Sequence, residues 1–497
     1  MLDAAAAPLS RATDTTLTEQ LTTRFAERIR QRLLAPGARL PSVRECARQH
    51  AVSPYTVVAA YDQLLALGLV EARKQRGFFV RDGGAHPHEP ARQANTGHAT
   101  APAARRGGSA DSGPHLPHNV LPISATALIR GMFQPPPGSP PMPGLGTLPV
   151  DWLDLPMLAA ALRKVTSGAQ LGAVSLTYGD PAGELRLREA LAIKLADHGI
   201  QATPSQIITT IGATHALDVV TRTLLRAGDS VLVDEPGWSV EYARLAALGM
   251  RVLPVPRGED GPDVAAMQRL IEAQKPGERP RLYVTVSVLH NPTGASLSLQ
   301  SAHRVLQLAQ AHDLHIVEDD TYSHLAPAHL PRLAALDALE RTIYVSGFSK
   351  ILAPNWRVGY LAAPVNLVER LIDTKLLTTL TTPGLTERAL AHCLEQGQLR
   401  RHAERVMTRL AAARARTVKL AEAHDCRFAA PPRGLFGWLD VGVDTERLAQ
   451  SMIDNWLLAP GALFHASHRP TTLMRVNFAT SQDARFWAQL ARVRAMS

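Results

Sequence analysis

The sequence lacks long hydrophobic runs and has few cysteines. No stretch of about 18 consecutive apolar residues occurs in the 497-residue chain, so we expect no membrane-spanning helix. The first residues show no basic region followed by an apolar core, so we expect no secretory signal. The three cysteines, Cys46, Cys393 and Cys426, are far apart, which fits neither a disulfide framework nor a metal clip. These absences predict a protein of the reducing cytoplasm.

The length and charge of the chain indicate how many domains it has and what kind of partner it can bind. A chain of 497 residues is too long for one hydrophobic core, so two or three domains are expected. The net charge of +9 is compatible with a polyanionic partner. Residues 1–81 hold twelve Lys and Arg against seven Asp and Glu, a net +5, so more than half of the excess lies in about a sixth of the chain.

Residues 82–120 separate two regions of different composition. They are rich in Gly, Pro, Ala, His and Ser and have almost no large apolar residues, so they cannot offset the entropy cost of folding. We interpret them as a flexible linker. A histidine-rich metal tract is the alternative, but the spacing is irregular and we predict no metal; the histidines are His86, His88, His98, His115 and His118.

Residues 15–81, before the linker, have the pattern of three helices followed by two short strands. Apolar residues recur every four positions from Leu17 to Leu33, which predicts one face of a helix. Ser42 is the expected N-cap of a second helix. A third helix is expected to start at Ser53 and Pro54 and to end at Gly68. "VEARKQRGFFV" then predicts two strands around a basic turn, which completes the order of a winged helix-turn-helix.

This block resembles the GntR-type winged-helix domain through "PGARLPSVRECARQHAVSPYTVVAAYDQLLALGLVEARKQRGFFV". The resemblance implies that double-stranded DNA is the partner. The basic turn alone could equally be a solvated surface turn. Pro54 departs from the family, which usually has an arginine there, so one contact to DNA is missing. The expected DNA-binding residues are Arg44, Ser53, Tyr55 and Thr56 in the helices and Arg73, Lys74 and Arg76 in the wing.

Residues 121–497 alternate strand-like and helical patterns. "QIITTIG", "DSVLVDEPG", "RLYVTVSV", "HIVEDD" and "TIYVSG" are expected strands, and helical patterns separate them. The alternation predicts an α/β domain with a mostly parallel sheet, in which ligands bind at the carboxyl ends of the strands.

Polar and aromatic residues follow several of these strands. Each has an ordinary structural explanation, such as a helix cap, a packing tryptophan or a surface lysine. Together they match the edges of pyridoxal 5′-phosphate: an aldehyde that bonds a lysine, a ring nitrogen that needs a carboxylate, and a phosphate that needs arginine and backbone donors. The residues are Ala213, Thr214, Trp238, Asn291, Asp319, Tyr322, Lys350 and Arg357.

The order of these motifs resembles the fold type I, class I aminotransferases. The resemblance implies a Schiff base on Lys350, a ring-nitrogen partner in Asp319 and an effector or substrate carboxylate bound by Arg475. Asn291 and Tyr322 would bond the phenolic oxygen of the ring. The other residues implied are Trp238 for stacking, Ala213, Thr214, Ser349 and Arg357 for the phosphate, and Tyr178 for the phosphate of a neighbouring subunit.

Gly347 departs from this family, which often has Ser or Thr three residues before the lysine. A hydroxyl contact to the phosphate is lost there unless Ser346 compensates. We expect a large subdomain over about 150–375 and a small α+β subdomain over about 376–497.

The whole chain resembles the MocR subfamily of GntR regulators. The resemblance implies a cytoplasmic, head-to-tail homodimer that binds DNA and pyridoxal phosphate and senses an amino acid, an amine or the cofactor. The alternative is an active aminotransferase with a residual DNA-binding arm, and a structural or cofactor-buffering protein is a third interpretation. A multiple-turnover assay separates the first two.

Overall fold

The structure, a computed structural model, describes residues 9, 15–30, 34, 37–73, 76–81, 142–453 and 455–496. The predicted linker at 82–120, Leu33 and Lys74 lie outside the described residues. Contacts divide the chain into a smaller unit that includes Ala7–Ala127 and a larger unit that includes Leu128–Ser497.

The smaller unit consists of three helices and a two-stranded antiparallel wing. Ser42 and Ser53 cap the second and third helices through the N–H groups of Glu45 and Thr56, and Gly68 has a positive φ of 67° just after the third helix. The predicted caps and helix end are therefore confirmed. The elements are α1 (Leu17–Arg30), α2 (Val43–His50), α3 (Pro54–Ala66), β1 (Val70–Arg73) and β2 (Gly77–Val80).

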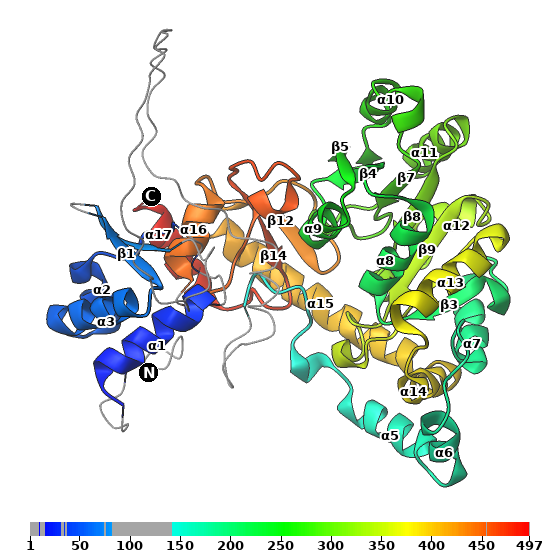
Figure 1. The fold of residues 1–497 in the computed structure, drawn as a ribbon, viewed down its shortest axis with the longest axis horizontal. Helices are drawn as coiled ribbons and strands as arrows, with labels where there is room; N and C mark the ends of the chain where they lie inside the picture. The colour runs from blue at the N-terminus through cyan, green and yellow to red at the C-terminus, as the bar shows by residue number, and fades with distance from the viewer. Residues whose placement is uncertain are drawn as a thin grey trace, which may run out of the picture. The chain divides into compact units, whose positions relative to one another are not determined.

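The larger unit contains an eight-stranded sheet, shown in Figure 1, in the order β3-β10-β9-β8-β7-β4-β5-β6. The ladders that join β5, β4, β7, β8 and β9 are parallel, whereas β10 runs antiparallel to both β3 and β9. The five predicted strands are confirmed. The strands are β3 (Ile207–Thr210), β4 (Ser230–Glu235), β5 (Arg251–Gly258), β6 (Gly261–Pro262), β7 (Leu282–Thr285), β8 (His315–Asp319), β9 (Thr342–Gly347) and β10 (Gly359–Ala362).

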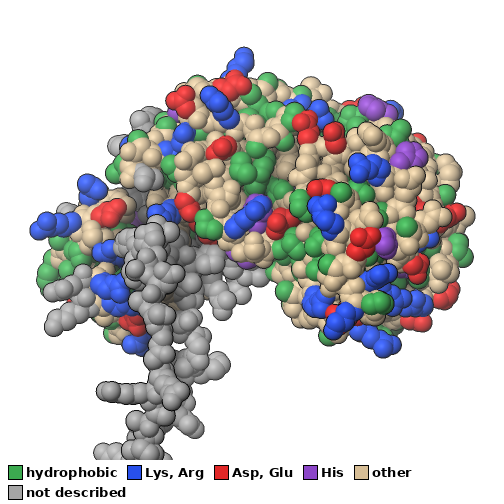
Figure 2. Space-filling model, turned by 90° about the horizontal axis from the view of Figure 1, so that it is seen from above, with side chains coloured by type: hydrophobic (Ala, Val, Ile, Leu, Met, Phe, Trp, Pro, Cys, Tyr) green, Lys and Arg blue, Asp and Glu red, His purple; other side chains and the backbone are tan. Residues whose placement is uncertain are grey.

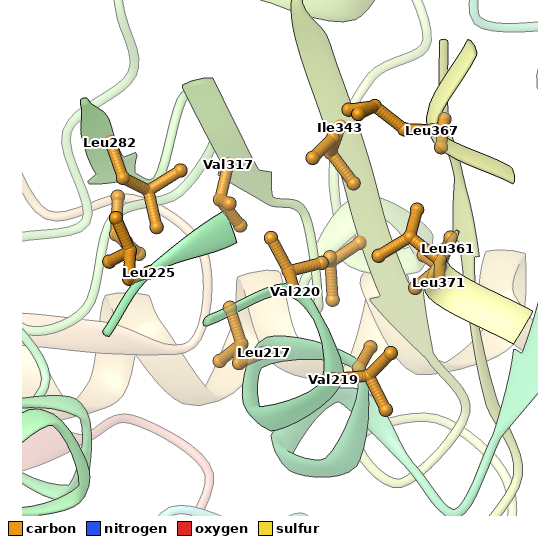
Figure 3. Close-up of a cluster of buried hydrophobic side chains, with 14 of the residues drawn as sticks. Leu217, Val219, Val220, Leu225, Leu282, Val317, Ile343, Leu361, Leu367 and Leu371 are labelled. Atoms are coloured by element: carbon orange, nitrogen blue, oxygen red, sulfur yellow. The ribbon is translucent and has the colours of Figure 1, made fainter. Parts of the chain in front are cut away.

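Helices cover both faces of this sheet. Along β4, Val231 and Val233 belong to the apolar cluster that includes α8, whereas Leu232 belongs to the cluster that includes α10 and α11. Side chains alternate between the faces of a strand, so a continuous apolar run is buried on both sides. Figure 3 shows Leu217, Val219 and Val220 of α8 beneath Val317, Ile343 and Leu361 of the strands.

The helices of this part are α5 (Leu155–Val165), α6 (Ala169–Ser175), α7 (Leu185–Ala196), α8 (Ala213–Leu224), α9 (Ser239–Ala247), α10 (Val264–Glu272), α11 (Leu299–Ala311), α12 (Leu333–Leu336), α13 (Val368–Thr379) and α14 (Gly384–Glu395).

A smaller α+β part follows the sheet. Its four-stranded antiparallel sheet has the order β11-β12-β14-β13, and the long helix α15 leads into it. The predicted fold class is therefore correct. The elements are α15 (Gln398–Glu422), β11 (Arg427–Phe428), β12 (Phe436–Asp440), α16 (Thr445–Met452), β13 (Ala459–Pro460), β14 (Leu473–Asn477) and α17 (Ala484–Arg494).

Figure 2 shows acidic and basic side chains interspersed over the face of the larger unit that is in view. Within the described ranges, no helix has the length and apolar character needed to cross a membrane. The same ranges contain no group of three or more His, Cys, Asp or Glu side chains that could hold a metal ion.

Candidate functional site

The candidate site lies at one edge of the large sheet, where β3, β8 and β9 end. These three strands run in one direction, because β10 is antiparallel to both β3 and β9 and β8 is parallel to β9. Their carboxyl ends therefore meet at the same edge, the usual place for ligands in open α/β sheets. β14 of the small sheet contributes a further residue, Arg475.

Lys350 lies three residues after the end of β9. Its Nζ donates to the carbonyl oxygen of Gly146 at 2.8 Å. The pKa of Lys350 is lowered to about 8, mainly by burial and also by the positive charges of Arg475 and Arg357, whereas the charge of Asp319 raises it. A lysine with such a pKa supplies the neutral amine that attacks a carbonyl carbon.

Asp319 ends β8 and presents a carboxylate near Lys350. Burial raises the pKa of Asp319 to about 6, and hydrogen bonds from the hydroxyl and the N–H of Thr321 oppose this shift. The next residue, Asp320, is fully buried and accepts hydrogen bonds from Arg332 Nε at 2.6 Å and the Tyr344 hydroxyl at 2.9 Å. Of the two adjacent acids, Asp319 is therefore the one that can serve a ligand.

Arg475 is a buried cation in the middle of β14. Its Nη1 donates to Asn291 Oδ1 at 3.0 Å and its Nη2 donates to the carbonyl oxygen of Gly144 at 2.8 Å. Its Nε has no hydrogen-bond partner within the described residues. The guanidinium lies 4.4 Å from the ring centre of Phe436 and 5.2 Å from that of Phe464. Burial lowers the pKa of Arg475 to about 10, so it stays charged at neutral pH and can bind a carboxylate.

Tyr322 and Asn291 lie beside Arg475. Burial raises the pKa of Tyr322, and the charge of Arg475 and a hydrogen bond with Asn291 oppose the shift. The phenol is therefore neutral at physiological pH and can donate a hydrogen bond. The ring of Tyr322 packs edge-on against Phe436 at 5.4 Å, which fixes its orientation.

Arg357 and the start of α8 form an anion-binding corner. Arg357 Nη2 donates to the carbonyl oxygen of Ile211 at 3.2 Å, and Nη1 donates to Ser349 Oγ at 3.3 Å. Gly212 has a φ of 78°, which strains other residues, and a Cβ there would lie 2.6 Å from Arg357 Nη2 and displace the guanidinium. The first N–H groups of a helix, here those of Ala213 and Thr214, have no partner inside it and attract anions.

Ser346 does not compensate for Gly347 as the sequence suggested it could. Its hydroxyl donates to the carbonyl oxygen of Asp320 at 2.9 Å and is fully buried. Successive residues of a strand face opposite sides, so Ser346 points away from the side that Gly347 faces. A Cβ on Gly347 would lie 3.5 Å from the N–H of Ala213, at the start of α8.

Two further predicted residues follow β4 and α6 in the sequence. Trp238 is half-buried at the start of α9 and packs against the apolar cluster that includes α8. Tyr178 is 82% exposed, as suits a residue expected to act on another subunit.

Sequence reasoning missed the segment at residues 143–147, just before the short helical turn Val150–Trp152. The carbonyl oxygens of Gly144 and Gly146 accept from Arg475 and Lys350, and Asn477 holds the same segment. The "MPGLGTLP" composition marks a turn but gives no sign of its partners. The sequence could have identified Asn477 as a site residue. It lies two residues after Arg475, and alternate residues of a strand face the same side.

In the smaller unit, the predicted DNA-binding residues lie on the helices and the wing. Tyr55 is 83% exposed at the start of α3, Arg44 is exposed on α2, and Arg76 is exposed in the wing. Ser53 Oγ accepts from the N–H of Thr56 and is 2.8 Å from its hydroxyl, so the two side chains close the helix start.

Arg73 has neighbours within the wing. Its Nε donates to Glu71 at 2.7 Å, and its guanidinium lies 4.5 Å from the ring centre of Phe79. Of the two described wing arginines, the exposed Arg76 is therefore better placed than Arg73 to contact a DNA phosphate.

The comparison with known families covers both units. The family described as aminotransferase class I and II matches residues 146–488, more than two thirds of the chain. The chain belongs to this family. The bacterial regulatory proteins of the gntR family match residues 17–80, so the aminotransferase domain is joined to a helix-turn-helix domain of a DNA-binding family. This organisation is that of the MocR regulators.

Individual relatives of this aminotransferase-family chain are of two kinds. The HTH-type transcriptional regulator YisV of Bacillus subtilis is 27% identical over 95% of both chains. The probable rhizopine catabolism regulatory protein MocR of Rhizobium meliloti is 29% identical over 82% of this chain and 77% of its own. The 2-aminoadipate transaminase of Thermus thermophilus is 30% identical over 62% of this chain and 78% of its own.

The solved structures similar to this chain include LysN, the α-aminoadipate aminotransferase of Thermus thermophilus. It aligns with a TM-score of 0.66 and 25% identity over 74% of this chain and 95% of its own. The fold of the larger unit is therefore the fold type I aminotransferase fold.

The cofactor of this family is pyridoxal 5′-phosphate, and the described residues fit it. Lys350 offers an amine for the aldehyde. Asp319 offers a buried carboxylate that could accept a hydrogen bond from the ring N–H. The anion-binding corner of Arg357 and α8 offers a site for the phosphate. When bound, the cofactor supplies an aldehyde for the lysine and a ring that accepts electrons. The unpartnered Arg475 Nε leaves a donor for a carboxylate beside that site.

Proposed function

We propose that this protein is a pyridoxal phosphate-dependent transcription regulator that senses an amino compound. The observation that carries the proposal is the combination, in one chain, of a GntR helix-turn-helix domain with Lys350, Asp319 and Arg475 gathered at one sheet edge. A carboxylate-binding arginine beside a cofactor lysine favours an amino acid as the ligand.

The proposal assigns residues 15–81 to DNA binding, 82–120 to a linker and 121–497 to ligand binding. Within the last region, the large subdomain spans about 150–375 and the small one about 376–497. A ligand changes DNA binding in such a chain only if its affinity differs between two arrangements of the protein.

The roles proposed for the site follow from its chemistry. Lys350 holds the cofactor covalently, Asp319 keeps its ring nitrogen protonated, and Arg475 binds the carboxylate of the effector. Tyr322 and Asn291 bond the phenolic oxygen. The further residues are Trp238 for stacking and Ala213, Thr214, Ser349 and Arg357 for the phosphate.

We also propose a cytoplasmic, head-to-tail homodimer. The exposure of Tyr178, together with the exposed Leu176 and Leu377, supports a surface that a second copy covers. In that arrangement Tyr178 reaches the phosphate bound by the other chain.

Two measurements test this function. Lys350→Ala is expected to abolish the near-visible absorbance of the bound cofactor, whereas Lys275→Ala, at an 84% exposed side chain, keeps it. Binding to the DNA upstream of the protein's own or a neighbouring gene is expected to depend on Arg73, Lys74 and Arg76 and to change with pyridoxal phosphate. Intact DNA binding after all three are changed to Ala would show that the winged helix is not the DNA-binding element.

An active aminotransferase is the second candidate. The pKa of about 8 for Lys350 favours it, because a lysine that is partly neutral at physiological pH can also move protons during transamination. A multiple-turnover assay with amino donors and 2-oxoglutarate decides between them. Sustained turnover favours the enzyme, and a single stoichiometric turnover favours the regulator.

A further inference from the structure

The outer face of α3 is unusually poor in charged groups for a helix that enters the major groove of DNA. The structure describes every residue of α3, and none of them is Lys or Arg. Tyr55 is 83% exposed and Val58 is 41% exposed. The residues that share the outer face, by their helical spacing, are Tyr55, Val58, Ala59 and Asp62. The residues of the opposite face, which are buried in the core of the smaller unit, are Val57, Ala60, Tyr61 and Leu64.

The start of α3 offers few hydrogen-bonding groups to a base. Pro54 has no N–H. Ser53 Oγ accepts from the N–H of Thr56 at 3.0 Å, and the two hydroxyl oxygens are 2.8 Å apart, so these side chains bond each other. The first two turns therefore present the ring and the single hydroxyl of Tyr55 together with the methyl groups of Val58 and Ala59.

The bases differ in what they show to such a surface. In the major groove guanine presents two acceptors, which call for donors such as those of Arg or Lys, whereas thymine presents a methyl group that apolar side chains contact. Val58 matches the methyl group. Asp62, one turn further on, can only accept hydrogen bonds when it is ionised, so it adds no partner for guanine. Gln63 lies to the side of this face, where its Oε1 accepts from the hydroxyl of Thr22 at 2.7 Å.

The exposed cations of the smaller unit lie on the elements next to α3. Both α2 and the wing strand β1 pack against α3. A Cβ on Gly77 would lie 3.3 Å from Arg39 Nε, so Arg39 lies against the turn of the wing. Cations bind the phosphates of any DNA sequence, and they commit this surface to duplex DNA, the partner of the gntR family that matches residues 17–80. The exposed arginines on α2, at the wing and just before α2 are Arg39, Arg44, Arg48 and Arg76.

We propose that α3 identifies its target site by the methyl groups of thymine in the major groove, with Val58 as the main contact and the ring of Tyr55 beside it. This inference rests on the DNA-binding part of the proposed function and adds which base is recognised. Contact removes the methyl group and the valine from water, which corresponds to a gain in affinity of about fourfold for each methyl group. The arginines on the neighbouring elements contribute equally to all sequences.

The first experiment removes the methyl groups from the DNA. The full chain selects duplexes from a random-sequence library, and the enriched duplex is synthesised once with thymine and once with uracil, which lacks only the methyl group. We expect thymines in the enriched site and binding of the uracil duplex that is weaker by about fourfold or more. Fluorescence anisotropy at one fixed salt concentration measures both affinities, because phosphate contacts depend on salt.

The outcomes of this experiment separate the inference from the proposed function. Equal affinities for the thymine and uracil duplexes, or binding without enrichment of thymine, overturn the thymine inference alone. Failure of the chain to bind any duplex overturns the proposed function and this inference with it.

The second experiment removes the apolar contact from the protein. Val58 is exposed and alanine favours helices, so Val58→Ala is expected to fold and to lower the ratio of thymine-duplex to uracil-duplex affinity about twofold or more. Leu67→Ala is the matched control, because Leu67 is 54% exposed but lies about 120° around the helix from Tyr55, and its ratio should stay that of the parent.

Arg76→Ala distinguishes a phosphate contact from a base contact. It is expected to weaken binding of both duplexes by the same factor and to keep the ratio. A full preference for thymine in folded Val58→Ala would mean that the chain responds to the shape of the duplex, which the methyl groups also affect, and would overturn the inference.

Discussion

Burial at single residues sets the chemistry of the site. It lowers the pKa of Lys350 to about 8 and raises that of Asp319 to about 6, because the charged form of each group is disfavoured away from water. At pH 7 about a tenth of such a lysine is neutral, against well under a thousandth of a lysine with an ordinary pKa. The burial of Lys350 therefore increases its reactivity, because it increases the fraction of neutral amine.

The uptake of pyridoxal phosphate is expected to follow the titration of Lys350. The neutral amine is the reactive form, so the association rate should rise with pH and level off above a midpoint of about 8. Stopped-flow absorbance over pH 6 to 10 measures this. In Arg475→Gln the midpoint should move to higher pH, because one of the positive charges that lower the lysine pKa is gone. A midpoint near the ordinary lysine value in the unmodified chain would contradict this account.

Gly347→Ser is expected to strengthen the binding of pyridoxal phosphate. The new Cβ has room, at 3.4 Å from the carbonyl of Val358, and stands 3.5 Å from the N–H of Ala213 at the anion-binding corner. One added hydrogen bond to a charged phosphate, about 1.5–3 kcal/mol, corresponds to a gain in affinity of about tenfold or more. Equilibrium titration compares it with Gly347→Ala, which adds the carbon without the hydroxyl and should bind as the parent does. Equal affinities for the two variants would place the phosphate elsewhere.

Among the elements, β10 has the largest effect on the geometry of the site. It lies antiparallel between β3 and β9 and so brings the start of α8 beside the loop that carries Lys350. The backbones of Gly359 in β10 and Gly212 before α8 lie close together, since a Cβ on Gly359 would be 2.5 Å from the carbonyl carbon of Gly212. The positions of the anion-binding corner and of Lys350 therefore depend on one backbone contact.

Gly359→Ala is expected to destabilise the larger unit by about 1–3 kcal/mol, the usual cost of overpacking. It should also weaken binding of pyridoxal phosphate, because the start of α8 moves away from Arg357. Urea unfolding and cofactor titration measure the two effects. Gly277→Ala is the control, since its Cβ would meet nothing within 4 Å. Normal stability and affinity in Gly359→Ala would show that this contact is dispensable.

The elements also show what a sequence can and cannot predict. The five apolar runs before Asp319, Lys350 and the other site residues were found because strands buried on both faces are continuously apolar. β10 was not predicted, because "GYLA" is too short to give a pattern. β5 was not predicted either, because it contains two prolines, which are rare in central strands. The contacts of residues 143–147 were not found because carbonyl oxygens make them, and every residue has a carbonyl oxygen. The resemblance singled out Asp319 over Asp320, and the partners of the two carboxylates in the structure give the physical reason.

In the whole molecule, ligand binding is expected to depend on a second chain. Tyr178 is largely exposed within one chain, so it is positioned to act on another. In Tyr178→Phe, the affinity for pyridoxal phosphate should fall about tenfold or more, the usual effect of losing a hydrogen bond to a charged group. In the unmodified chain, the affinity for pyridoxal phosphate should fall when dilution separates the proposed dimer, and sedimentation measures the dissociation in parallel. Unchanged affinity in both cases would mean that each chain holds its cofactor alone.

Residues 143–147 contact Lys350, Arg475 and Asn477 through the backbone, which has a consequence for how this protein can change over evolution. Five carbonyl oxygens make these contacts, so the side chains of Leu145 and Thr147 can be replaced without altering those hydrogen bonds. Gly144 is the exception, because any side chain there meets Leu458. Substitutions at Leu145 and Thr147 can therefore leave this hydrogen-bond network in place.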